Sequence, residues 1–513
     1  MNLLRALATV SSLTFVSRVL GYLRDFIIAR AFGASLGTDA FFVAFRIPNL
    51  LRRLFAEGAF SQAFVPVLAA EKGRDEQGVK ALIDGVATLL FVALVLAAAL
   101  GIAIAPLIVY VFAPGFAKGP DPARFDLTVT MLRITFPYIV FISLTALSAG
   151  VLNTWSRFSV PAITPTLLNV AFIVGALGFA DRFAPPVLVL AWAVFAGGVL
   201  QLAFQVPFLA RMGLLPRWRL DFRHPGVRRI LRLMAPAAFG VSISQVSLLI
   251  NTIFASFLVT GSVTWLYYAD RLMEFPAGLL GAALGTILLP SLSKYHASAN
   301  AAEYSRLLDW GLRVTFVLAA PAAAALAVLA IPLIASLFHY GRFSAVDAWM
   351  TRQALAAYSV GLLGMILVKI LAPGFYARQD IRTPVKIGLL TLAATQLMNL
   401  AFIVPFRHAG LALAIGLGAC LNAALLYRGL RRRGAYVPEA GWLLFLLKVA
   451  AAVALMALVL HVAMGEPGWW LQARWPRKIP ALLGLVVLGA GTYGACLAAF
   501  GFRLRHFARR GAA

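Results

Sequence analysis

The chain has 513 residues, of which 62% are hydrophobic and 12% are charged, and its 45 Lys and Arg against 19 Asp and Glu give a net charge of +26. A soluble domain is roughly half apolar and about a quarter charged, so this composition excludes a soluble globular protein, which could not cover so much apolar volume with polar surface. In a membrane protein, topology explains the positive charge better than nucleic-acid binding does.

Apolar runs long enough to cross a bilayer, at roughly 20 residues each, follow one another along the whole chain. They predict an all-α polytopic membrane protein with about fourteen transmembrane helices. Several runs are longer than a crossing requires, so we expect tilt, kinks or extensions beyond the bilayer. In chain order the predicted spans are 8–32, 38–69, 81–112, 130–154, 159–180, 186–210, 229–259, 264–292, 308–339, 350–375, 384–405, 408–430, 441–464 and 479–501.

Several classes of protein are disfavoured by what the sequence lacks. No apolar core precedes the small-residue triplet at 6–8, so the first span is interpreted as an uncleaved helix and not as a signal peptide. Cys420 and Cys496 lie in apolar spans without metal-binding spacing, so we expect no disulfide framework, metal site or cofactor. Paired carboxylates, a nucleophile triad and a Walker loop are not found, which argues against an enzyme or an ATP-driven pump.

The loops between the spans alternate between many and few basic residues. Because cytoplasmic loops carry an excess of Lys and Arg, we place the N-terminus in the cytoplasm, and an even number of spans places the C-terminus there as well. The longest basic stretch, 211–232, joins the sixth and seventh spans. We interpret it as topogenic charge that touches anionic lipid headgroups, with a regulatory or partner site as the alternative.

The sequence contains an internal repeat. Residues 60–66 align with 284–290, and, with gaps, 167–174 resemble 397–404. Both copies start on the cytoplasmic side, so they predict two six-helix lobes in a parallel pseudo-twofold repeat, an arrangement in which transporters bind substrate between the lobes. The predicted domains are an N-lobe (1–210), a basic cytoplasmic linker (211–232), a C-lobe (233–433), and two additional C-terminal helices with a basic tail (434–513).

Charge is distributed unequally between the two copies. The first span carries Arg18, Arg24 and Asp25, whose counterparts in the second copy are uncharged. The second span also holds charges that its counterpart mostly lacks. The first lobe therefore concentrates charge that the shared fold does not require.

An ionised side chain at membrane depth costs at least ~2.5–3.5 kcal/mol, and Arg does not escape by losing its proton. The arginines must therefore be paired, or must face water or an anionic ligand. One interpretation is a set of structural ion pairs, such as Arg53 with Glu57 four residues later. The other is a wet cavity whose guanidinium forks bind phosphate oxygens. The predicted substrate-binding residues are Arg18, Arg24, Arg52, Arg53 and Arg271, and the supporting acids are Asp25, Asp39, Glu57, Asp270 and Glu274.

Other polar residues in the spans are weaker candidates. Lys369 is either an ion-coupling residue or an amine that snorkels or binds a carbonyl. Asn169 and Asn399 are expected to act between helices rather than as ligands.

Long segments of the chain resemble the MurJ (MviN) family of lipid II flippases, within the superfamily of multidrug exporters and polysaccharide-lipid flippases. The segments are MNLLRALATVSSLTFVSRVLGYLRDFIIARAFG, TDAFFVAFRIPNLLRRLFAEGAFSQAFVPVLA, NTIFASFL, YYADRLMEFPAGLLGAALGTILLPSLS and LAPGFYARQDIRTPVKI. The resemblance implies a central cavity between two six-helix lobes, and a groove for the undecaprenyl tail made by the last two helices. It also implies essential charges at Arg18, Arg24, Asp39, Arg52 and Arg271, supported by Arg53 and Glu57.

The resemblance further implies that the chain flips lipid II, an undecaprenyl-diphosphate-linked disaccharide pentapeptide, from the inner to the outer leaflet of the bacterial cytoplasmic membrane by alternating access. Expected partners are lipid II, membrane lipids and the cell-wall synthesis machinery, and not nucleic acid. The alternatives are an exporter of drugs or of another polyprenyl-diphosphate-oligosaccharide, which a cationic cavity disfavours for cationic drugs, or a non-transporting cell-wall scaffold.

Overall fold

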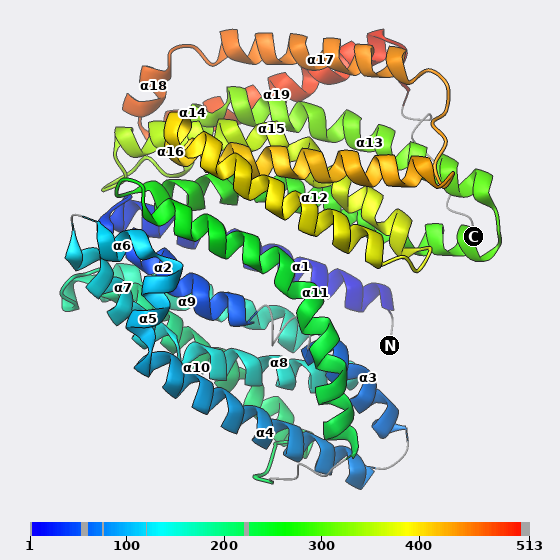
Figure 1. The fold of residues 1–513 in the computed structure, drawn as a ribbon. Helices are drawn as coiled ribbons and strands as arrows, with labels where there is room; N and C mark the ends of the chain where they lie inside the picture. Colours follow the sequence, from blue (N-terminus) through cyan, green and yellow to red (C-terminus); the bar gives the residue numbers. More distant parts are fainter. Residues whose placement is uncertain (1–2, 53–59, 74–75, 120, 220–224, 504–513) are drawn as a thin grey trace. The chain divides into compact units, whose positions relative to one another are not determined.

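The computed structural model describes residues 3–52, 60–73, 76–119, 121–219 and 225–503. All regular structure in these residues is helical (Figure 1), which confirms the predicted all-α class. Nine helical segments among them are long and apolar enough to cross a membrane, so the larger number of crossings stays a prediction. The chain divides into two compact units, called here the N-terminal unit (Met1–Thr264) and the C-terminal unit (Trp265–Ala513).

The N-terminal unit is a bundle in which α1 packs along α9, α9 along α10, and α2 along α7 and α8. Helix α7 begins directly after an N-cap, where the Asp121 carboxylate accepts a hydrogen bond from the Ala123 N–H at 3.2 Å. The helices are α1 (Leu3–Phe32), α2 (Leu36–Arg52), α3 (Phe60–Lys72), α4 (Glu76–Ala103), α5 (Ala105–Phe112), α6 (Pro114–Lys118), α7 (Pro122–Thr135), α8 (Tyr138–Thr154), α9 (Ser159–Gly178), the short 3₁₀ turn η2 (Ala180–Arg182), α10 (Leu188–Arg211), α11 (Pro225–Ser256) and the start of α12 (Ser262–Ala297).

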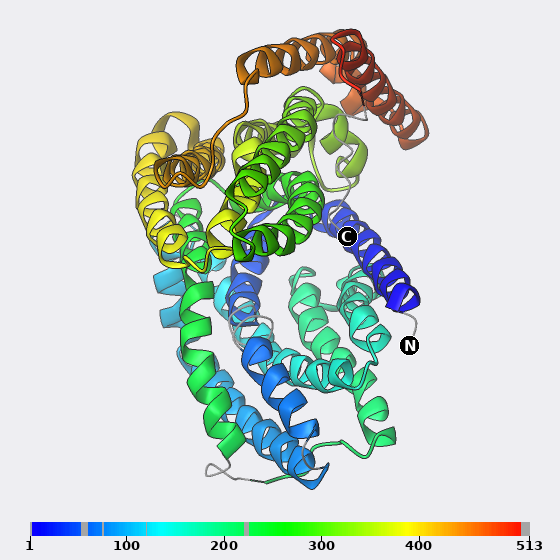
Figure 2. The ribbon, with the colours of Figure 1, turned by 90° about the vertical axis from the view of Figure 1, so that its right-hand side faces the viewer.

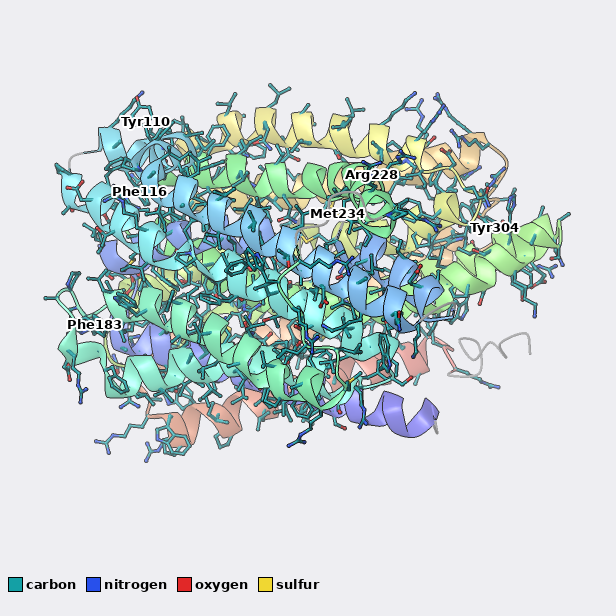
Figure 3. All side chains as sticks on the ribbon, turned by 90° about the horizontal axis from the view of Figure 1, so that it is seen from below. Tyr110, Phe116, Phe183, Arg228, Met234 and Tyr304 are labelled. Atoms are coloured by element: carbon teal, nitrogen blue, oxygen red, sulfur yellow. The ribbon has the colours of Figure 1, made fainter. Side chains whose placement is uncertain are left out.

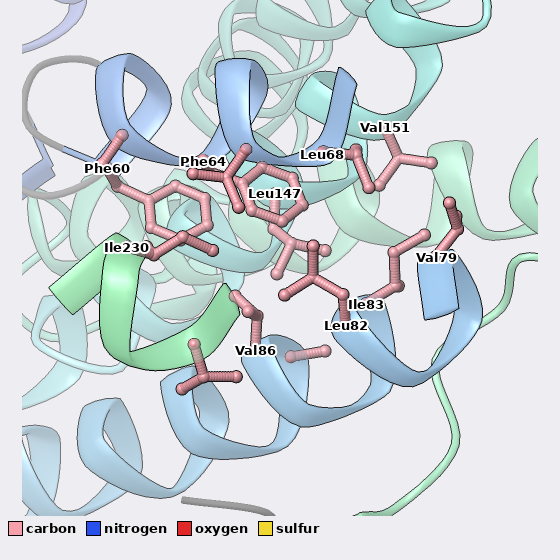
Figure 4. Close-up of a cluster of buried hydrophobic side chains, with 14 of the residues drawn as sticks. Phe60, Phe64, Leu68, Val79, Leu82, Ile83, Val86, Leu147, Val151 and Ile230 are labelled. Atoms are coloured by element: carbon pink, nitrogen blue, oxygen red, sulfur yellow. The ribbon is translucent and has the colours of Figure 1, made fainter. Parts of the chain in front are cut away.

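Figure 4 shows an apolar core of the N-terminal unit, in which α3 faces α4. Phe60, Phe64 and Leu68 are spaced four residues apart, so they share one face of α3, and they belong to the same buried cluster as Leu82 and Val86 of α4. Helices α8 and α11 contribute further buried aliphatic side chains to it. Lipid tails are as apolar as these side chains, so close van der Waals packing holds the helices together.

α11 packs against α3 and α4, and is therefore part of the compact N-terminal unit. The predicted lobes were defined by the repeat and not by packing, and they divide the chain within 211–232. The division of the chain within 211–232 therefore stays a prediction. The assignment of 434–513 to a separate part stays a prediction as well.

The C-terminal unit contains the rest of α12 and a closely packed pair, α15 and α16. A Cβ atom at Gly361 would lie only 2.0 Å from the Cα of Gly416, so only glycine lets these two backbones approach so closely. α15 starts with a capping box, in which Ser344 and Asp347 exchange side-chain-to-backbone hydrogen bonds. The remaining helices are α13 (Ala301–Val328), α14 (Ala330–Leu337), α15 (Ala345–Tyr376), α16 (Arg382–Arg432), α17 (Trp442–Ala463), α18 (Pro467–Gln472) and α19 (Trp475–Ala499).

The backbone of α16 breaks at Arg407, whose φ of 50° and ψ of −128° are not helical. A Cβ atom at Gly410 would lie 2.3 Å from the carbonyl oxygen of Phe402. These residues would be about 12 Å apart in a straight helix, so the chain folds back sharply at this point. The break falls between the predicted spans 384–405 and 408–430.

Two predicted spans are each divided into a long and a short helix. The span 81–112 breaks at Ile104, between α4 and α5, and the span 308–339 breaks at Leu329, between α13 and α14. Proline lies in the first turn of both short helices. The first turn tolerates proline because its N–H groups have no partner within the helix.

Helices α17 and α19 lie at one edge of the C-terminal unit (Figure 2). α17 packs on α13 and α19, and α14 contacts α18 and α19. The Tyr493 hydroxyl donates a hydrogen bond to the Val317 carbonyl oxygen at 2.8 Å, which ties α19 to α13.

Candidate functional site

The first candidate pair, Arg24 and Asp25, lies on α1 and is held against α9. The Arg24 guanidinium donates to an Asp25 carboxylate oxygen at 2.6 and 2.9 Å, and to the Asn169 side-chain oxygen at 3.1 Å. Asn169 in turn donates to the carbonyl oxygen of Ser17 at 3.2 Å, so it joins the two helices as expected. Asp25 is fully buried, whereas the Arg24 side chain keeps 11% of its surface exposed. Arg24 is therefore fixed in place with a small part of its side chain still accessible.

Arg18 lies on the exposed side of the same helix, near Phe15 and Val19, which are also exposed. No ion pair joins it to another residue in the described part of the chain. Arg18 therefore lies on an accessible face of α1.

Asp39 of α2 accepts hydrogen bonds on both of its carboxylate oxygens. Its carboxylate accepts from the Arg124 guanidinium at 2.6 Å, from the backbone N–H groups of Gly261 and Thr264 at 2.7 and 2.9 Å, and from the Thr264 hydroxyl at 2.7 Å. Asp39 is completely buried, and its partner Arg124 also lies over the Phe116 ring at 3.8 Å. One carboxylate thus ties α2 to α7 and to the start of α12.

Arg124 was not among the predicted site residues, because its position between two spans suggested a loop. The pair with Asp39 joins residues 85 positions apart, which no local pattern indicates. The sequence did contain a local signal that Arg124 lies in a helix. Asp121 followed by Pro122 marks a helix start, and this start places Arg124 inside α7.

The other basic residues of α2 lie toward its C-terminal end. Arg46 donates to the Thr252 hydroxyl of α11 at 2.6 Å, and Arg52 donates to the side-chain oxygen of Asn49 at 2.9 Å. Both arginines are partly buried. Arg53 and Glu57, and the ion pair predicted between them, lie outside the described residues.

Two predicted residues of the C-terminal unit form a weak pair on α12. Arg271 donates to a Glu274 carboxylate oxygen at 3.3 Å, and the two side chains are 34% and 56% exposed. Asp270 is partly buried beside them. Lys369 donates to the carbonyl oxygen of Ala277 at 3.1 Å, which agrees with the carbonyl-bound alternative predicted for this amine.

Asp309 of α13, a buried carboxylate of the C-terminal unit, was also missed by the sequence analysis. It accepts from Arg313 at 2.7 Å, from the Tyr436 hydroxyl and the Trp442 indole at 2.7 Å each, and from the Glu439 N–H at 3.2 Å. Arg313 lies on α13 itself, and the other three donors come from the connection between α16 and α17 and from the first residue of α17. Asp309 therefore sets where α17 begins relative to α13.

The structure thus brings Arg24 together with Asp25, and Arg271 together with Glu274, while Asp39 is engaged by a residue outside the predicted set. Arg18, Arg24 and Arg52 belong to the N-terminal unit and Arg271 to the C-terminal unit. The convergence of these arginines on one ligand stays a prediction.

Comparison with known proteins gives consistent matches over nearly the whole chain. The model of the family described as lipid II flippase MurJ matches residues 28–469. A lipid II flippase MurJ from Burkholderia cenocepacia is 54% identical, over 99% of this chain and 100% of that relative. A probable lipid II flippase MurJ from Haemophilus influenzae is 42% identical, over 96% of this chain and 99% of that relative.

Solved structures show the same fold at lower identity. A lipid II flippase MurJ in an inward closed conformation matches with a TM-score of 0.79 and 24% identity, over 96% of this chain and 98% of that one. A multidrug resistance MATE family transporter of the MOP superfamily, in an inward-facing conformation, matches with a TM-score of 0.65 and 17% identity, over 82% of this chain and 94% of that one.

Proposed function

Because this chain belongs to the MurJ family of lipid II flippases, we propose that it carries lipid II from the inner to the outer leaflet of the bacterial cytoplasmic membrane. The observation that carries the proposal is the 54% identity to a lipid II flippase over essentially the full length of both chains. The chain is an integral membrane protein with many apolar helices, and its relatives are named as transporters and not as enzymes.

The arginines on α1, α2 and α12 are proposed to bind the diphosphate of lipid II. Support comes from the partly accessible side chain of Arg24, from the exposed position of Arg18, and from the long, half-exposed contact between Arg271 and Glu274. Guanidinium groups bind phosphate oxygens through two parallel hydrogen bonds. At Arg271 a diphosphate would have to displace only the weakly bound carboxylate of Glu274. Displacing the Asp39 carboxylate would be harder, because four hydrogen bonds hold it.

Transport is proposed to proceed by alternating access of two six-helix lobes with both chain ends in the cytoplasm, about fourteen crossings in all. The lobes would rock around the bound head group, as in other two-lobed transporters. The membrane potential supplies ~2.3 kcal/mol per charge per 100 mV, enough to reset a cationic cavity.

The last two long helices, α17 and α19, are proposed to hold the undecaprenyl tail. Leu443, Leu447 and Val462 of α17 and Val487 of α19 expose well over half of their surface. Such a surface suits a polyprenyl chain, because hydrocarbon contact costs it nothing within the bilayer.

The test is to deplete the native protein in cells that express a variant, and to measure lipid II in the outer leaflet together with the variant's abundance. Replacing Arg24, Arg52 or Arg271 by Ala removes a charge-assisted hydrogen bond, worth roughly 1.5–3 kcal/mol or ten- to a hundredfold in affinity. We expect normal abundance and failed flipping, with partial rescue by Lys, which keeps the charge but loses the fork.

The structural alternative predicts a different pattern for the same variants. If Arg24 only neutralises Asp25, then Arg24→Ala lowers abundance, and adding Asp25→Asn restores both abundance and flipping. Normal flipping by all three Ala variants at wild-type abundance would remove the basis for the cationic site.

A further inference from the structure

The exposed face of α12 around Arg271 carries aromatic and aliphatic side chains as well as charge. Phe275, one helical turn after Arg271, exposes 49% of its surface, and Leu279, another turn on, exposes 55%. The Glu274 side chain is 56% exposed. Because residues three and four positions apart are neighbours on a helix, these side chains form one accessible strip along α12.

The opposite face of α12 is packed into the C-terminal unit. Met273 and Ala277 are buried, and Leu284 belongs to a buried cluster with Tyr304 of α13, which Figure 3 labels. Leu284 follows Phe275 by about two and a half helical turns, and so lies on the other side of the helix. The strip that contains Phe275 is therefore separate from the core that holds α12 in place.

The charges on the strip decide what it faces. The predicted span 264–292 places Arg271 and Glu274 at membrane depth, where an ionised side chain against hydrocarbon is costly. This side of α12 must therefore meet water or a polar ligand. Phe275 is exposed on the same side, so its ring is stabilised when a ligand removes it from water.

The strip has an open space next to Phe275. A Cβ atom at Gly278 would meet nothing within 4 Å. Lys369 of α15 crosses α12 beyond this glycine, since its Nζ donates to the Ala277 carbonyl oxygen at 3.1 Å and its side chain fills the space beside Gly281. Around the helix, Gly278 comes between Phe275 and Lys369, so a flat group has room to lie against the Phe275 ring.

We propose that Phe275, Glu274 and Gly278 form the subsite for the sugar that is joined to the diphosphate of lipid II, an inference that rests on the proposed function. One face of a pyranose ring presents mainly C–H groups, so it packs on an aromatic ring while the hydroxyl groups at its rim keep their hydrogen bonds. Phe275 supplies the ring, and Gly278 leaves the space for the sugar.

The position of the subsite follows from the proposed diphosphate site. Arg271 and Phe275 are about 6 Å apart along the helix axis, so a sugar attached to a phosphate at Arg271 reaches the Phe275 ring. When the diphosphate displaces Glu274 from Arg271, the freed carboxylate needs new hydrogen-bond donors. The sugar hydroxyl groups supply them, and Glu274 then fixes the orientation of the sugar on Phe275.

The test measures binding to the full-length protein in mild detergent by native mass spectrometry across a titration. The probes are undecaprenyl diphosphate, the same lipid carrying the disaccharide without the peptide, and lipid II. We expect the wild type to bind the disaccharide probe about three- to tenfold more tightly than undecaprenyl diphosphate, the range of a ring contact.

Variants of Phe275 separate the aromatic ring from apolar bulk. Phe275→Leu should abolish the preference for the disaccharide probe and leave the affinity for undecaprenyl diphosphate unchanged. Phe275→Trp should keep the preference, because it keeps an aromatic ring. The matched control is Phe406→Leu, which changes another exposed phenylalanine of the C-terminal unit and should alter no affinity.

Two further variants test the space and the carboxylate. Gly278→Leu should weaken binding of the two sugar-bearing probes only, whereas Gly388→Leu, at a glycine of α16 with equally open surroundings, should not. Glu274→Ala should reduce the preference for sugar. It should also tighten binding of undecaprenyl diphosphate, because it removes the carboxylate that competes for Arg271.

Three results would overturn the proposal: equal affinity of the wild type for the disaccharide probe and undecaprenyl diphosphate, a preference that Phe275→Leu leaves intact, or a loss in Phe275→Leu and Gly278→Leu that is equal for all three probes. A preference seen with lipid II and not with the disaccharide probe assigns Phe275 to the peptide, and the proposal is wrong. Each of these results leaves the proposed transport function standing. That function fails on a separate measurement, the absence of lipid II flipping by the wild-type chain, and this inference then fails with it.

Discussion

The two units of the molecule place their buried, bonded carboxylates at different points of the fold. In the N-terminal unit, a fully buried carboxylate, Asp39, binds donors from α7 and from the start of α12. In the C-terminal unit, the closest helix pair meets backbone to backbone at Gly361 and Gly416, and the buried carboxylate Asp309 lies where a connector joins a helix.

This contrast gives a structural meaning to the unequal charge of the two repeats. Part of the extra charge in the first copy already forms ion pairs within the fold, since Asp39 and Asp25 are both buried and bonded to arginine. Within the first copy, charge beyond the needs of the fold should therefore be sought at Arg18, at Arg52 and at the exposed part of Arg24, and not at Asp39. The following changes test the contrast.

Arg124→Ala should have the largest effect on stability. It leaves the Asp39 carboxylate buried without its cation, and breaking a buried ion pair costs about 3–5 kcal/mol. The thermal unfolding midpoint in detergent and the cellular abundance should both fall sharply. Adding Asp39→Asn should recover part of the loss. An unchanged midpoint in Arg124→Ala would mean that Asp39 does not depend on this pair.

Asp309→Asn should destabilise the C-terminal unit less, by about 1.5–3 kcal/mol, the value of hydrogen bonds to a charged group. Its partner Arg313 is 22% exposed and can turn to water, which Arg124 cannot do as easily. Glu303→Gln on the same helix is the control, because its pair with Arg306 is exposed and is worth about 0–1 kcal/mol. Equal midpoints for the two variants would contradict the role given to Asp309.

Gly361→Ala should destabilise the α15–α16 pair by about 1–3 kcal/mol through overpacking, because the added methyl group has no space beside Gly416. Gly388→Ala is the matched control on α16, since nothing lies within 4 Å of its added carbon. The control should be neutral or slightly stabilising. If both variants unfold at the same temperature, the close approach of Gly361 and Gly416 does not stabilise the α15–α16 pair.

Asp380→Asn, in the connection between α15 and α16, should have the smallest effect on stability. This effect should depend on pH. Burial raises the pKa of this carboxyl, but bonds from Thr383 and Arg433 outweigh it and lower the pKa to about 2. The stabilisation is therefore present above the unfolded pKa of about 3.9 and is lost as pH falls from there toward 2.

For this exposed ion pair the contribution is at most about 1 kcal/mol. The midpoint of Asp380→Asn relative to the wild type, measured at pH 5 and again near pH 3, should show a difference that shrinks at the lower pH. A difference that grows on acidification would reverse the assigned direction of the pKa shift.

The all-α class and the positions of the apolar helical segments could be predicted from the sequence. Apolar runs of membrane length satisfy their backbone hydrogen bonds within the bilayer by forming helices. The helix breaks at Ile104 and Leu329 did not follow, because apolar content continues across them. Among the site residues, the pairing of Arg24 with its neighbour Asp25 lay within reach of sequence reasoning. The partner of Asp39 did not, because that contact depends on how distant helices pack.

The fold-back at Arg407 bears on how the protein is inserted during synthesis. The 51 residues of α16 would measure about 77 Å as one straight helix, more than twice the ~30 Å hydrocarbon thickness. With no connecting loop between its halves, the segment leaves the ribosome as one nearly continuous apolar stretch. Once the first half has been inserted across the membrane, the orientation of the second half is fixed as well. Arg407 is the residue at which the chain reverses.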